Sequence, residues 1–235
     1  MLTIKSSKLN LSSKCKVLDM GCGEGRHTIS FNVFDEVDSF GFDLSLEDLK
    51  KAKEKLKDFN TDLISSKCHF GSTDIHNLPF LDNTFDAVIC SEVLEHIESV
   101  PKAISELVRV LKPKGVLGIS VPRFLPEWIC WKLSRGYQEM PGGHIRIFKQ
   151  SQLRNLVEEH KVNYLSFHWA HALHSPYWWL QCLFWETKED SSLIKLYHKF
   201  LVWDLMKKPF ITKLLEVIFQ PLIGKSLVMY FKKDI

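Results

Sequence analysis

The segment Lys16-Val17-Leu18-Asp19-Met20-Gly21-Cys22-Gly23-Glu24-Gly25 decides the fold of this chain. Residues 16–20 form a short apolar run that a glycine stops, which is typical of a buried strand. Glycines spaced GxGxG let the backbone turn tightly and approach a ligand closely, because they carry no Cβ. The helix expected from Glu24 offers unpaired N–H groups to an anionic group such as a carboxylate. Without a ligand, the segment is an ordinary strand-to-helix turn.

The rest of the first half alternates between strand and helix patterns. Apolar runs predict further strands over 37–42, 64–71, 85–90 and 115–121, and helical spacing predicts helices over 24–31, 45–59 and 100–111. This alternation predicts right-handed βαβ units and therefore a doubly wound α/β fold with a mostly parallel sheet. Ligands of such sheets bind at the carboxyl ends of the strands, so the residues that follow each strand are the candidate site.

Two aspartates stand just after predicted strands. Asp43 lies 20 residues beyond Gly23, where its carboxylate can accept hydrogen bonds from the 2′ and 3′ hydroxyls of a ribose. It would repel a 2′-phosphate, so we expect a ribose with free hydroxyls. Asp74 can accept from an exocyclic amino group while Ile75 packs on a purine. The alternatives are a helix N-cap for Asp43, a role for which Ser45 competes, and a simple turn for Asp74.

Taken together, these segments resemble the class I S-adenosylmethionine-dependent methyltransferases, and most closely the type 11 branch that includes quinone-biosynthesis enzymes. Five ordered segments carry the resemblance, at residues 17–25, 41–45, 74–80, 82–96 and 111–117. It implies a Rossmann-like, mostly parallel seven-stranded sheet that ends in an antiparallel pair. It also implies S-adenosylmethionine as the cofactor, with S-adenosylhomocysteine as the product.

The resemblance assigns the methionine part of the cofactor to the glycine-rich segment and its surroundings. Asp19 and the loop would hold the amino and carboxylate groups. Ser91, just after the fourth strand, would contact the methionine part through its backbone, and His27 is a further candidate to line the cofactor. The loop residues concerned are Gly21, Cys22, Gly23 and Gly25.

The resemblance assigns the adenosine part to the ends of the second and third strands. Asp43 would bind the ribose. Leu44 and Ile75 would sandwich the adenine, and Asp74 would accept a hydrogen bond from its amino group.

Few catalytic groups are needed for the implied chemistry, because a sulfonium is already an activated methyl donor. Holding donor and acceptor in line can lower a barrier by about 7–11 kcal/mol, and a general base helps when the acceptor is a hydroxyl or a protonated amine. The candidate bases are His96 and His144. The latter lies in a stretch that resembles the His-x-Arg-x-Phe segment of many type 11 members, in which Arg146 can orient an anionic acceptor. A packing or capping role is the alternative for each histidine.

Metal ligation is a further alternative for the segment after the fourth strand. If this stretch is helical, Glu92, Glu95 and His96 share one face, and some quinone-branch O-methyltransferases are thought to bind magnesium with such a trio. The same string also occurs in metal-free relatives, so we expect no metal there, nor at the loose histidine cluster of 168–174. The six cysteines stand singly without a CxxC pair, which excludes a zinc ribbon and a disulfide scaffold and indicates reduced thiols.

The second half of the chain differs from the first in charge and aromatic content. Residues 121–235 carry 16 Lys and Arg against 10 Asp and Glu, whereas residues 1–120 carry 15 against 18. Every Trp and Tyr lies in the second half. These compositions indicate two regions with different roles.

The second half is expected to complete the sheet and to add two insertions. We predict a helix over 150–160 and strands over 162–168 and 226–231, so the methyltransferase domain would comprise 1–168 and 226–235. The aromatic-rich insertions are residues 122–143 and 169–225. They either complete the core or form an apolar lid over the acceptor, which can also touch an anionic membrane through Trp and Lys.

The expected function is methyl transfer from S-adenosylmethionine to an oxygen, nitrogen or carbon atom of a small, hydrophobic or lipid-like acceptor. A nucleic-acid substrate is not expected, because the Asn/Asp-Pro-Pro-aromatic segment of base methyltransferases is missing after the fourth strand. The alternative is a non-catalytic cofactor-binding or membrane-surface protein. With no apolar signal core and no run of about 20 apolar residues, we expect a cytoplasmic protein, with peripheral membrane contact as a variant. The oligomeric state stays open.

Overall fold

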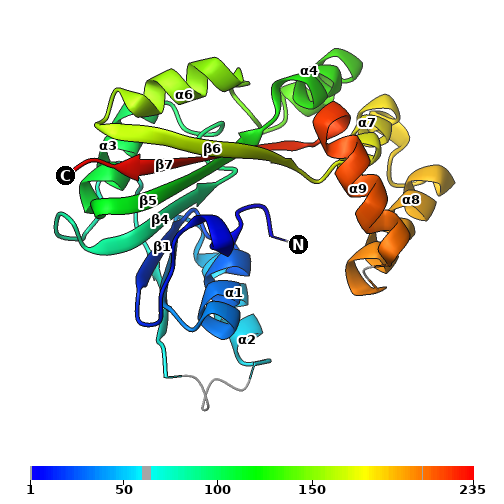
Figure 1. Cartoon of the computed structure of the whole chain (residues 1–235). Helices are drawn as coiled ribbons and strands as arrows, with labels where there is room; N and C mark the ends of the chain where they lie inside the picture. The colour runs from blue at the N-terminus through cyan, green and yellow to red at the C-terminus, as the bar shows by residue number, and fades with distance from the viewer. Residues whose placement is uncertain (1, 60–64, 208) are drawn as a thin grey trace.

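A seven-stranded sheet forms the centre of the computed structural model, which describes residues 2–59, 65–207 and 209–235. The strand order is β3-β2-β1-β4-β5-β7-β6, so the order reverses between β1 and β4. The strands are β1 (Lys16–Met20), β2 (Asp38–Asp43), β3 (Cys68–Ser72), β4 (Phe85–Ser91), β5 (Leu111–Pro122), β6 (Val162–Ala170) and β7 (Ser226–Lys233). β1 to β5 pair in parallel, whereas β7 runs antiparallel to both β5 and β6 (Figure 1). The predicted α/β fold with a terminal antiparallel pair is confirmed.

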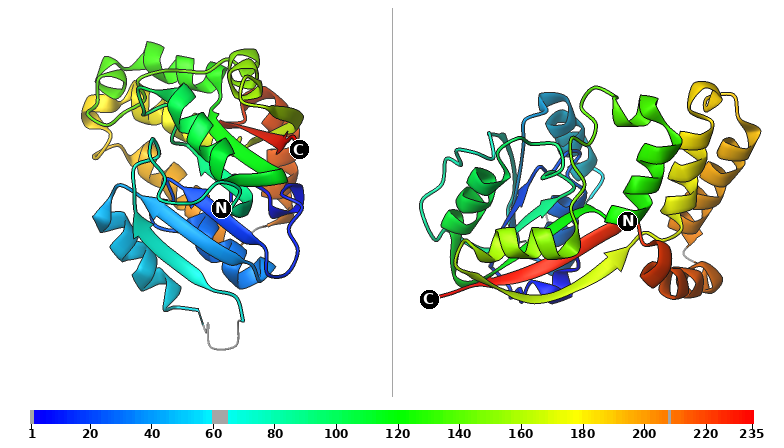
Figure 2. Two further views of the ribbon diagram at one scale, coloured as in Figure 1. Left: turned by 90° about the vertical axis from the view of Figure 1, so that its left-hand side faces the viewer. Right: turned by 90° about the horizontal axis from the view of Figure 1, so that it is seen from above.

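Helices cover both faces of the sheet. Figure 1 shows α1 (Arg26–Asp35) and α2 (Leu46–Leu56) on one face, and α3 (Val100–Val110) and α6 (Gln150–Glu158) on the other. A further group of helices stands at one end of the sheet, beyond the carboxyl end of β5 (Figure 2). This group contains α4 (Phe124–Leu133), α5 (Arg135–Gln138), α7 (His174–Leu183), α8 (Ser192–Lys207) and α9 (Phe210–Ile223). Two short 3-10 helices, Ser6–Lys8 and Trp185–Thr187, complete the described elements.

The first helix begins later than predicted. It starts at Arg26 and not at Glu24, because Gly23 and Gly25 adopt left-handed φ angles of +50° and +78° that no helix contains. By contrast α2 begins as predicted, where the hydroxyl of Ser45 accepts a hydrogen bond from the N–H of Asp48 at 3.2 Å.

The strands also differ from the prediction at their ends. β5 begins at Leu111, within the range assigned to the preceding helix, because Leu111 pairs with Phe85 of β4; the pairing then shifts register and resumes at Val116 opposite Ala87. β3 begins at Cys68, and the predicted start of that strand at residue 64 lies outside the described residues.

The core lies in two layers, one on each side of the sheet. One layer joins the sheet to α3 and α6 through residues such as Leu107, Leu117 and Val157. The other joins it to α1 and to the N-terminal segment, where Ile4 and Tyr230 are fully buried. The sheet that carries the candidate site is therefore rigidly supported on both faces.

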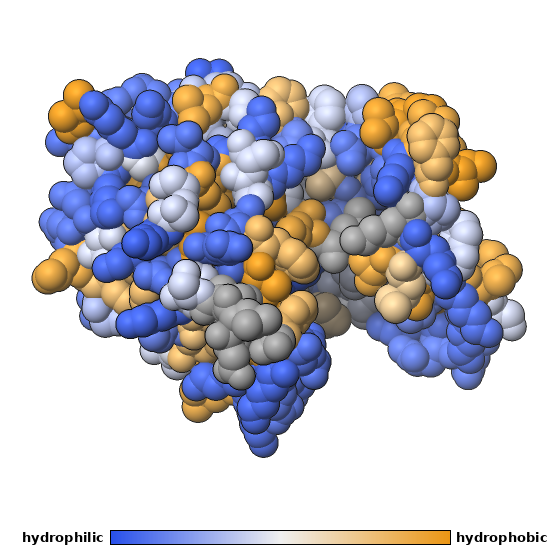
Figure 3. Space-filling model, turned by 60° about the horizontal axis from the view of Figure 1, so that its bottom comes forward, coloured by the Kyte–Doolittle hydropathy of each residue, from blue (hydrophilic) through white to orange (hydrophobic). Residues whose placement is uncertain are grey.

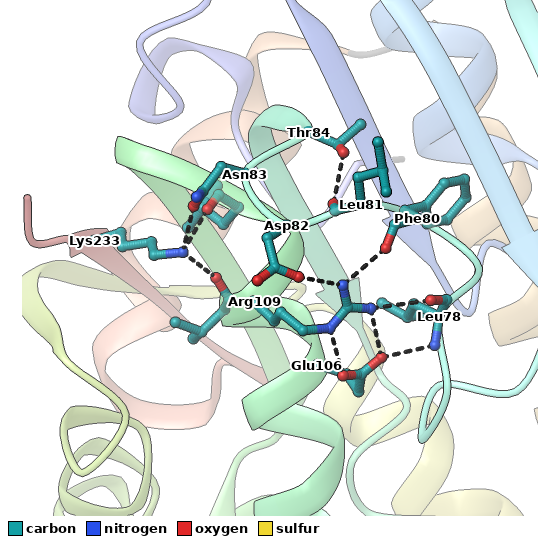
Figure 4. A network of polar contacts seen from close by, with 11 residues as sticks. Leu78, Phe80, Leu81, Asp82, Asn83, Thr84, Glu106, Arg109 and Lys233 are labelled. Atoms are coloured by element: carbon teal, nitrogen blue, oxygen red, sulfur yellow. Dashed lines mark hydrogen bonds and ion pairs between the residues drawn. The ribbon is translucent and has the colours of Figure 1, made fainter.

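One cation fixes the loop between β3 and β4. The guanidinium of Arg109 donates to the carbonyls of Leu78 at 3.0 Å and Phe80 at 2.8 Å, and pairs with Glu106 and Asp82 (Figure 4). These carboxylates raise the pKa of Arg109, and the guanidinium in turn lowers the pKa of Glu106. The loop that follows Asp74 is thus held by one side chain of α3.

Candidate functional site

The glycine loop after β1 is shaped for close approach. Gly21, like Gly23 and Gly25, has a left-handed φ, and a Cβ at Gly21 would lie 2.2 Å from the side chain of Val93. A Cβ at Gly23 would meet nothing within 4 Å, so open space lies beside that residue. The carbonyl of Phe42 accepts from the N–H groups of Gly21 and Cys22, which ties the loop to β2.

Asp19, at the carboxyl end of β1, lies beneath this loop with one oxygen unpartnered. Its Oδ2 accepts from the N–H and the hydroxyl of Thr28, at 3.1 Å and 2.6 Å. Its Oδ1 is buried and has no hydrogen-bond partner in the described residues. Burial raises the pKa of Asp19 to about 6. A buried acceptor without a donor fits a cationic amino group, which is the group that the sequence assigned to it.

Asp43 lies next to the loop at the end of β2. Its Oδ2 accepts from the N–H of Gly23 and its Oδ1 from the N–H of Ser45, both at 2.8 Å. Ser45, and not Asp43, caps α2, so the N-cap alternative for Asp43 is wrong. Each carboxylate oxygen retains a second lone pair. The predicted contact with a ribose stays a prediction, and the geometry leaves the carboxylate oriented to make it.

The three residues predicted to surround the adenine differ in exposure. Leu44 is 66% exposed and can cover a ligand. Asp74 is exposed and its Oδ1 pairs with the backbone and ring of His76, which lowers its pKa. Ile75 is 3% exposed and packs in the core, so it presents no free face in this structure. The predicted stacking of the adenine on Ile75 therefore needs a local movement. The predicted contacts of the adenine with Leu44 and Asp74 stay predictions.

Two other predicted cofactor residues have protein partners. The hydroxyls of Ser91 and Ser120 share a hydrogen bond of 2.9 Å at the ends of β4 and β5. His27 is buried, and its Nε2 accepts from the N–H groups of Thr3 and Ile4 at 3.1 Å each. Burial lowers the pKa of His27 to about 3, so the ring stays neutral and holds the N-terminal segment. Its predicted contact with the cofactor stays a prediction.

The chain after β4 turns and does not form a helix. Glu92 has a left-handed φ of +58°, and the next helix begins only at Val100. The hydroxyl of Ser120 donates to the carboxylate of Glu92 at 2.9 Å. Glu92, Glu95 and His96 therefore do not share a helix face, and the arrangement considered for that trio is wrong. The left-handed residue that ends β4 breaks the helical spacing.

The two candidate bases lie together, although 48 residues separate them. The rings of His96 and His144 are 4.9 Å apart, edge to face. Nδ1 of His144 lies 2.6 Å from Oε1 of Glu127 on α4, and the hydroxyl of Tyr137 donates to Oε2 of the same carboxylate at 3.3 Å. Glu95 is fully buried beside them, and its burial, reinforced by the charge of Glu92, raises its pKa well above the usual range.

Sequence reasoning missed Glu127 as the partner of His144. The signal was present, since Glu127 is the single acid in the apolar helix α4 and is 3% exposed. Burial of an ionisable group among Trp and Phe requires a partner. A histidine bound to a carboxylate through Nδ1 has Nε2 available for a proton or another electron-pair acceptor.

Two cavities flank this end of the sheet. One, of about 750 Å³, is lined by His96, His144 and residues of the α4–α5 region such as Trp131 and Met140. The other, of about 1480 Å³, opens between the glycine loop with α1 and the helices α8 and α9, and is visible as a hollow in Figure 3. Residues of the helical insertions therefore line both cavities.

A methyltransferase family accounts for most of the chain. The sequence model described as Methyltransferase domain matches residues 11–175. The chain belongs to this family. An uncharacterized methyltransferase of Schizosaccharomyces pombe is 41% identical over 104 residues, which are 43% of this chain and 37% of that protein. The sterol 24-C-methyltransferase of Candida albicans is 29% identical over 140 residues, which are 60% of this chain and 34% of that protein.

These matches leave the helical group partly uncovered. The chain spans little more than a third of the length of either relative, and the family match ends within α7, before α8 and α9. The crystal structure of the cyclase SpnF matches this chain with a TM-score of 0.65 and 19% sequence identity. The match covers 98% of this chain and 78% of the SpnF chain. This likeness shows the shared fold alone.

Proposed function

We propose that this protein transfers the methyl group of S-adenosylmethionine to an oxygen, nitrogen or carbon atom of a hydrophobic small molecule or lipid. The observation that carries the proposal is the unpartnered oxygen of Asp19 beneath the glycine loop, in a chain of a methyltransferase family. A buried carboxylate oxygen without a donor requires a proton or a cation. The ammonium group of the methionine part is such a cation.

Two carboxylates of this chain fit the cofactor. When bound, S-adenosylmethionine supplies an activated methyl group on its sulfonium. Asp19 would pair with the ammonium, and Asp43 would accept hydrogen bonds from the ribose hydroxyls. Because two backbone N–H groups already orient the Asp43 carboxylate, little entropy would be lost when the ribose binds.

Arg26 adds a positive charge at the start of α1. Its guanidinium donates to the hydroxyl of Thr3 at 3.2 Å, and burial lowers its pKa while the charges of Glu92 and Asp19 oppose that shift. Together with the helix N-terminus, this cation would attract the carboxylate of the methionine part.

An apolar acceptor is supported by the walls of the larger cavity. Its lining includes Ile29 and Phe34 on α1 and Leu205 of the helical group. The helical group itself packs around Trp and Tyr side chains. The Candida albicans relative is named for methylation of a sterol, which agrees with this class of acceptor.

Two experiments test the proposal. Calorimetry measures the binding of S-adenosylmethionine and S-adenosylhomocysteine, and a transfer assay follows a labelled methyl group to sterols, quinols and fatty acids. Both cofactor forms should bind the wild type and bind Asp43→Ala more weakly, while the exposed-site control Glu54→Ala should behave as the wild type. Failure of the wild type to bind either form would overturn the proposal. Binding without transfer to any hydrophobic acceptor would favour a non-catalytic cofactor-binding role.

A further inference from the structure

Glu95, His96 and His144 converge on one point at the wall of the smaller cavity. One ligand atom from each lies within 4.8 Å of the others. The Nε2 atoms of His96 and His144 are 3.9 Å and 4.0 Å from the same oxygen of Glu95. We propose that these three side chains bind a divalent transition-metal ion. This inference goes beyond the proposed methyl transfer and does not depend on it.

The hydrogen bonds of the two rings fix which nitrogen is free. Nδ1 of His144 faces a carboxylate oxygen of Glu127 at 2.6 Å, and Nδ1 of His96 faces the carbonyl of Gly143 at 3.1 Å. Both partners are acceptors, so each Nδ1 carries a hydrogen and Nε2 is the ring atom that can bind a metal. These are the atoms that point toward Glu95. Metal-bound histidines are held by the same kind of outer contact.

The third ligand has no other partner. Glu95 is fully buried, and neither of its carboxylate oxygens has a hydrogen-bond partner in the part of the chain that the structure describes. Two Nε2 lone pairs cannot donate to it. A cation placed between the carboxylate and the two Nε2 atoms would satisfy all three groups at once.

The donor set indicates the class of metal. Two imidazole nitrogens and one carboxylate suit Zn²⁺, Co²⁺, Ni²⁺, Fe²⁺ or Mn²⁺, whereas Mg²⁺ prefers oxygen ligands. Metal–ligand bonds of about 2.0–2.2 Å require neighbouring ligand atoms to lie roughly 3.0–3.4 Å apart. The separations of 3.9 Å and 4.0 Å to Glu95 would need to shrink by less than about 1 Å, and the widest pair of ligand atoms, which lies within 4.8 Å, by less than about 2 Å. Glu92 takes no part, because it accepts from Ser120.

The position also leaves His144 with one lone pair for two roles. A metal on Nε2 would prevent His144 from acting as a general base, so metal binding decides between the two. The contact of Glu127 with Nδ1 of His144 would then orient a metal ligand and not a general base. The cavity beside the cluster gives an ion access from solvent.

Zinc and cobalt titrations of chelator-treated, full-length protein test the proposal. The wild type should bind one Co²⁺ or Zn²⁺ per chain by calorimetry, and Co²⁺ should give visible absorption bands of a nitrogen- and oxygen-ligated ion. Glu95→Gln, which keeps the shape of the side chain, and His144→Ala should weaken binding by more than about 100-fold, and Glu127→Gln by about 10–100-fold. The exposed histidine variant His198→Ala is the matched control.

Two results would overturn the metal site. One is a wild type that takes up neither ion at one per chain. The other is a Glu95→Gln variant that binds as tightly as His198→Ala. Melting curves without metal separate these results from misfolding, because Glu95→Gln removes a buried ionisable group and should fold at least as stably as the wild type.

A separate observation concerns α9, whose polar side faces inward. Its buried residues are Thr212 and Glu216, and the Glu216 carboxylate accepts from the N–H groups of Ala172 and Leu173 at 2.8 Å and 3.3 Å. The outward side is apolar and strongly exposed. The exposed residues are Phe210, Ile211, Leu214, Val217, Ile218, Phe219 and Leu222. An apolar helix face of this extent indicates a binding surface.

The exposed charges of α8 and α9 select the partner. Among the described residues of α8 and α9, the exposed charged side chains are Lys195, Lys199, Lys207 and Lys213, whereas the acids Asp204 and Glu216 are half-buried and buried. We infer that α9 lies in the surface of an anionic phospholipid membrane. Its exposed apolar side would be immersed in the lipid, and the lysines would lie at the headgroups. A second copy of the chain would bring like charges together.

The helix would lie on the membrane and not cross it. Its 14 residues extend about 21 Å, and none of the helices in the described ranges is both long and apolar enough to span a bilayer.

Vesicle flotation tests this inference. The wild type should float with vesicles of phosphatidylcholine containing phosphatidylglycerol, less with phosphatidylcholine alone, and less at high salt. The double variant Ile211→Glu, Ile218→Glu should bind at least tenfold more weakly, while Leu46→Glu, an equally exposed leucine on α2, should bind as the wild type. Absence of wild-type binding, or a dimer that the double variant dissociates, would overturn the membrane role.

Discussion

Replacing Asp19 with asparagine should stabilise the protein and weaken cofactor binding. Asparagine keeps the size of the side chain and can still accept from Thr28, but it cannot ionise. Because Asp19 is 1% exposed and its Oδ1 is unpartnered, the charged form carries a desolvation cost that the neutral amide avoids. The same charge is the one that a bound ammonium group would need.

The magnitude follows from the raised pKa. Burial moves the pKa of Asp19 from 3.8 to about 6, and a difference of about 2 pKa units corresponds to ~3 kcal/mol. The pKa of Asp19 is higher in the folded state than in the unfolded state. Protonated Asp19 therefore contributes stability that is fully present below pH 3.8 and is lost as the pH rises through about 6. At pH 7, Asp19→Asn should therefore have a larger free energy of unfolding than the wild type by up to ~3 kcal/mol, and the difference should shrink toward pH 4.

Urea unfolding of both proteins between pH 4 and pH 7.5 measures this difference, and calorimetry at the same pH values measures cofactor affinity. Cofactor affinity of the wild type should rise between pH 5 and pH 7 as Asp19 ionises, and Asp19→Asn should bind at least tenfold more weakly at pH 7 without that rise. The reasoning is refuted if the stability difference does not change with pH, or if the variant is the less stable protein at pH 7.

Other residues give further predictions. Asp43→Ala should weaken cofactor affinity at least tenfold, about 1.4 kcal/mol, by calorimetry, while circular dichroism shows the fold intact; equal affinity would contradict the ribose contact. His144→Ala should lower turnover while cofactor affinity stays nearly unchanged, and an equal loss of both would assign the residue to cofactor binding. Arg109→Met should lower the free energy of unfolding by about 2–3 kcal/mol, because it leaves two carbonyls of the β3–β4 loop without their donor; a loss within experimental error in urea would contradict this. His27→Ala should cost about 1–3 kcal/mol and speed tryptic cleavage near Lys5, since Thr3 and Ile4 lose their acceptor; unchanged cleavage would argue against that anchor.

The sheet and the cofactor loop could be predicted because their signals are local. Short apolar runs, glycines after β1 and an acid at the end of β2 lie within a few residues of the elements they define. The strand ends then bring Gly23 and Asp43 together without any further information, and the 2.8 Å contact between them follows from the topology.

The pairing of His144 with Glu127 could not be predicted in the same way. It joins an insertion helix to a loop, and its geometry depends on how α4 packs beyond β5. The failure at Glu92 has a different cause, since helical spacing was assumed where one left-handed residue redirects the chain. Both errors concern the segments after β4 and β5, where the structure departs from regular βαβ units.

The residues of α9 show a further limit of pattern analysis. Apolar residues at helical spacing predict that a helix has one apolar side, but the spacing does not say whether that side faces the protein or the surroundings. On α9 the carboxylate of Glu216 is satisfied by two N–H groups at the turn before α7, and this contact fixes the polar side inward. The apolar side is left outside as a consequence. A buried acid on an otherwise apolar helix is therefore the sequence feature that would have indicated an exposed binding face.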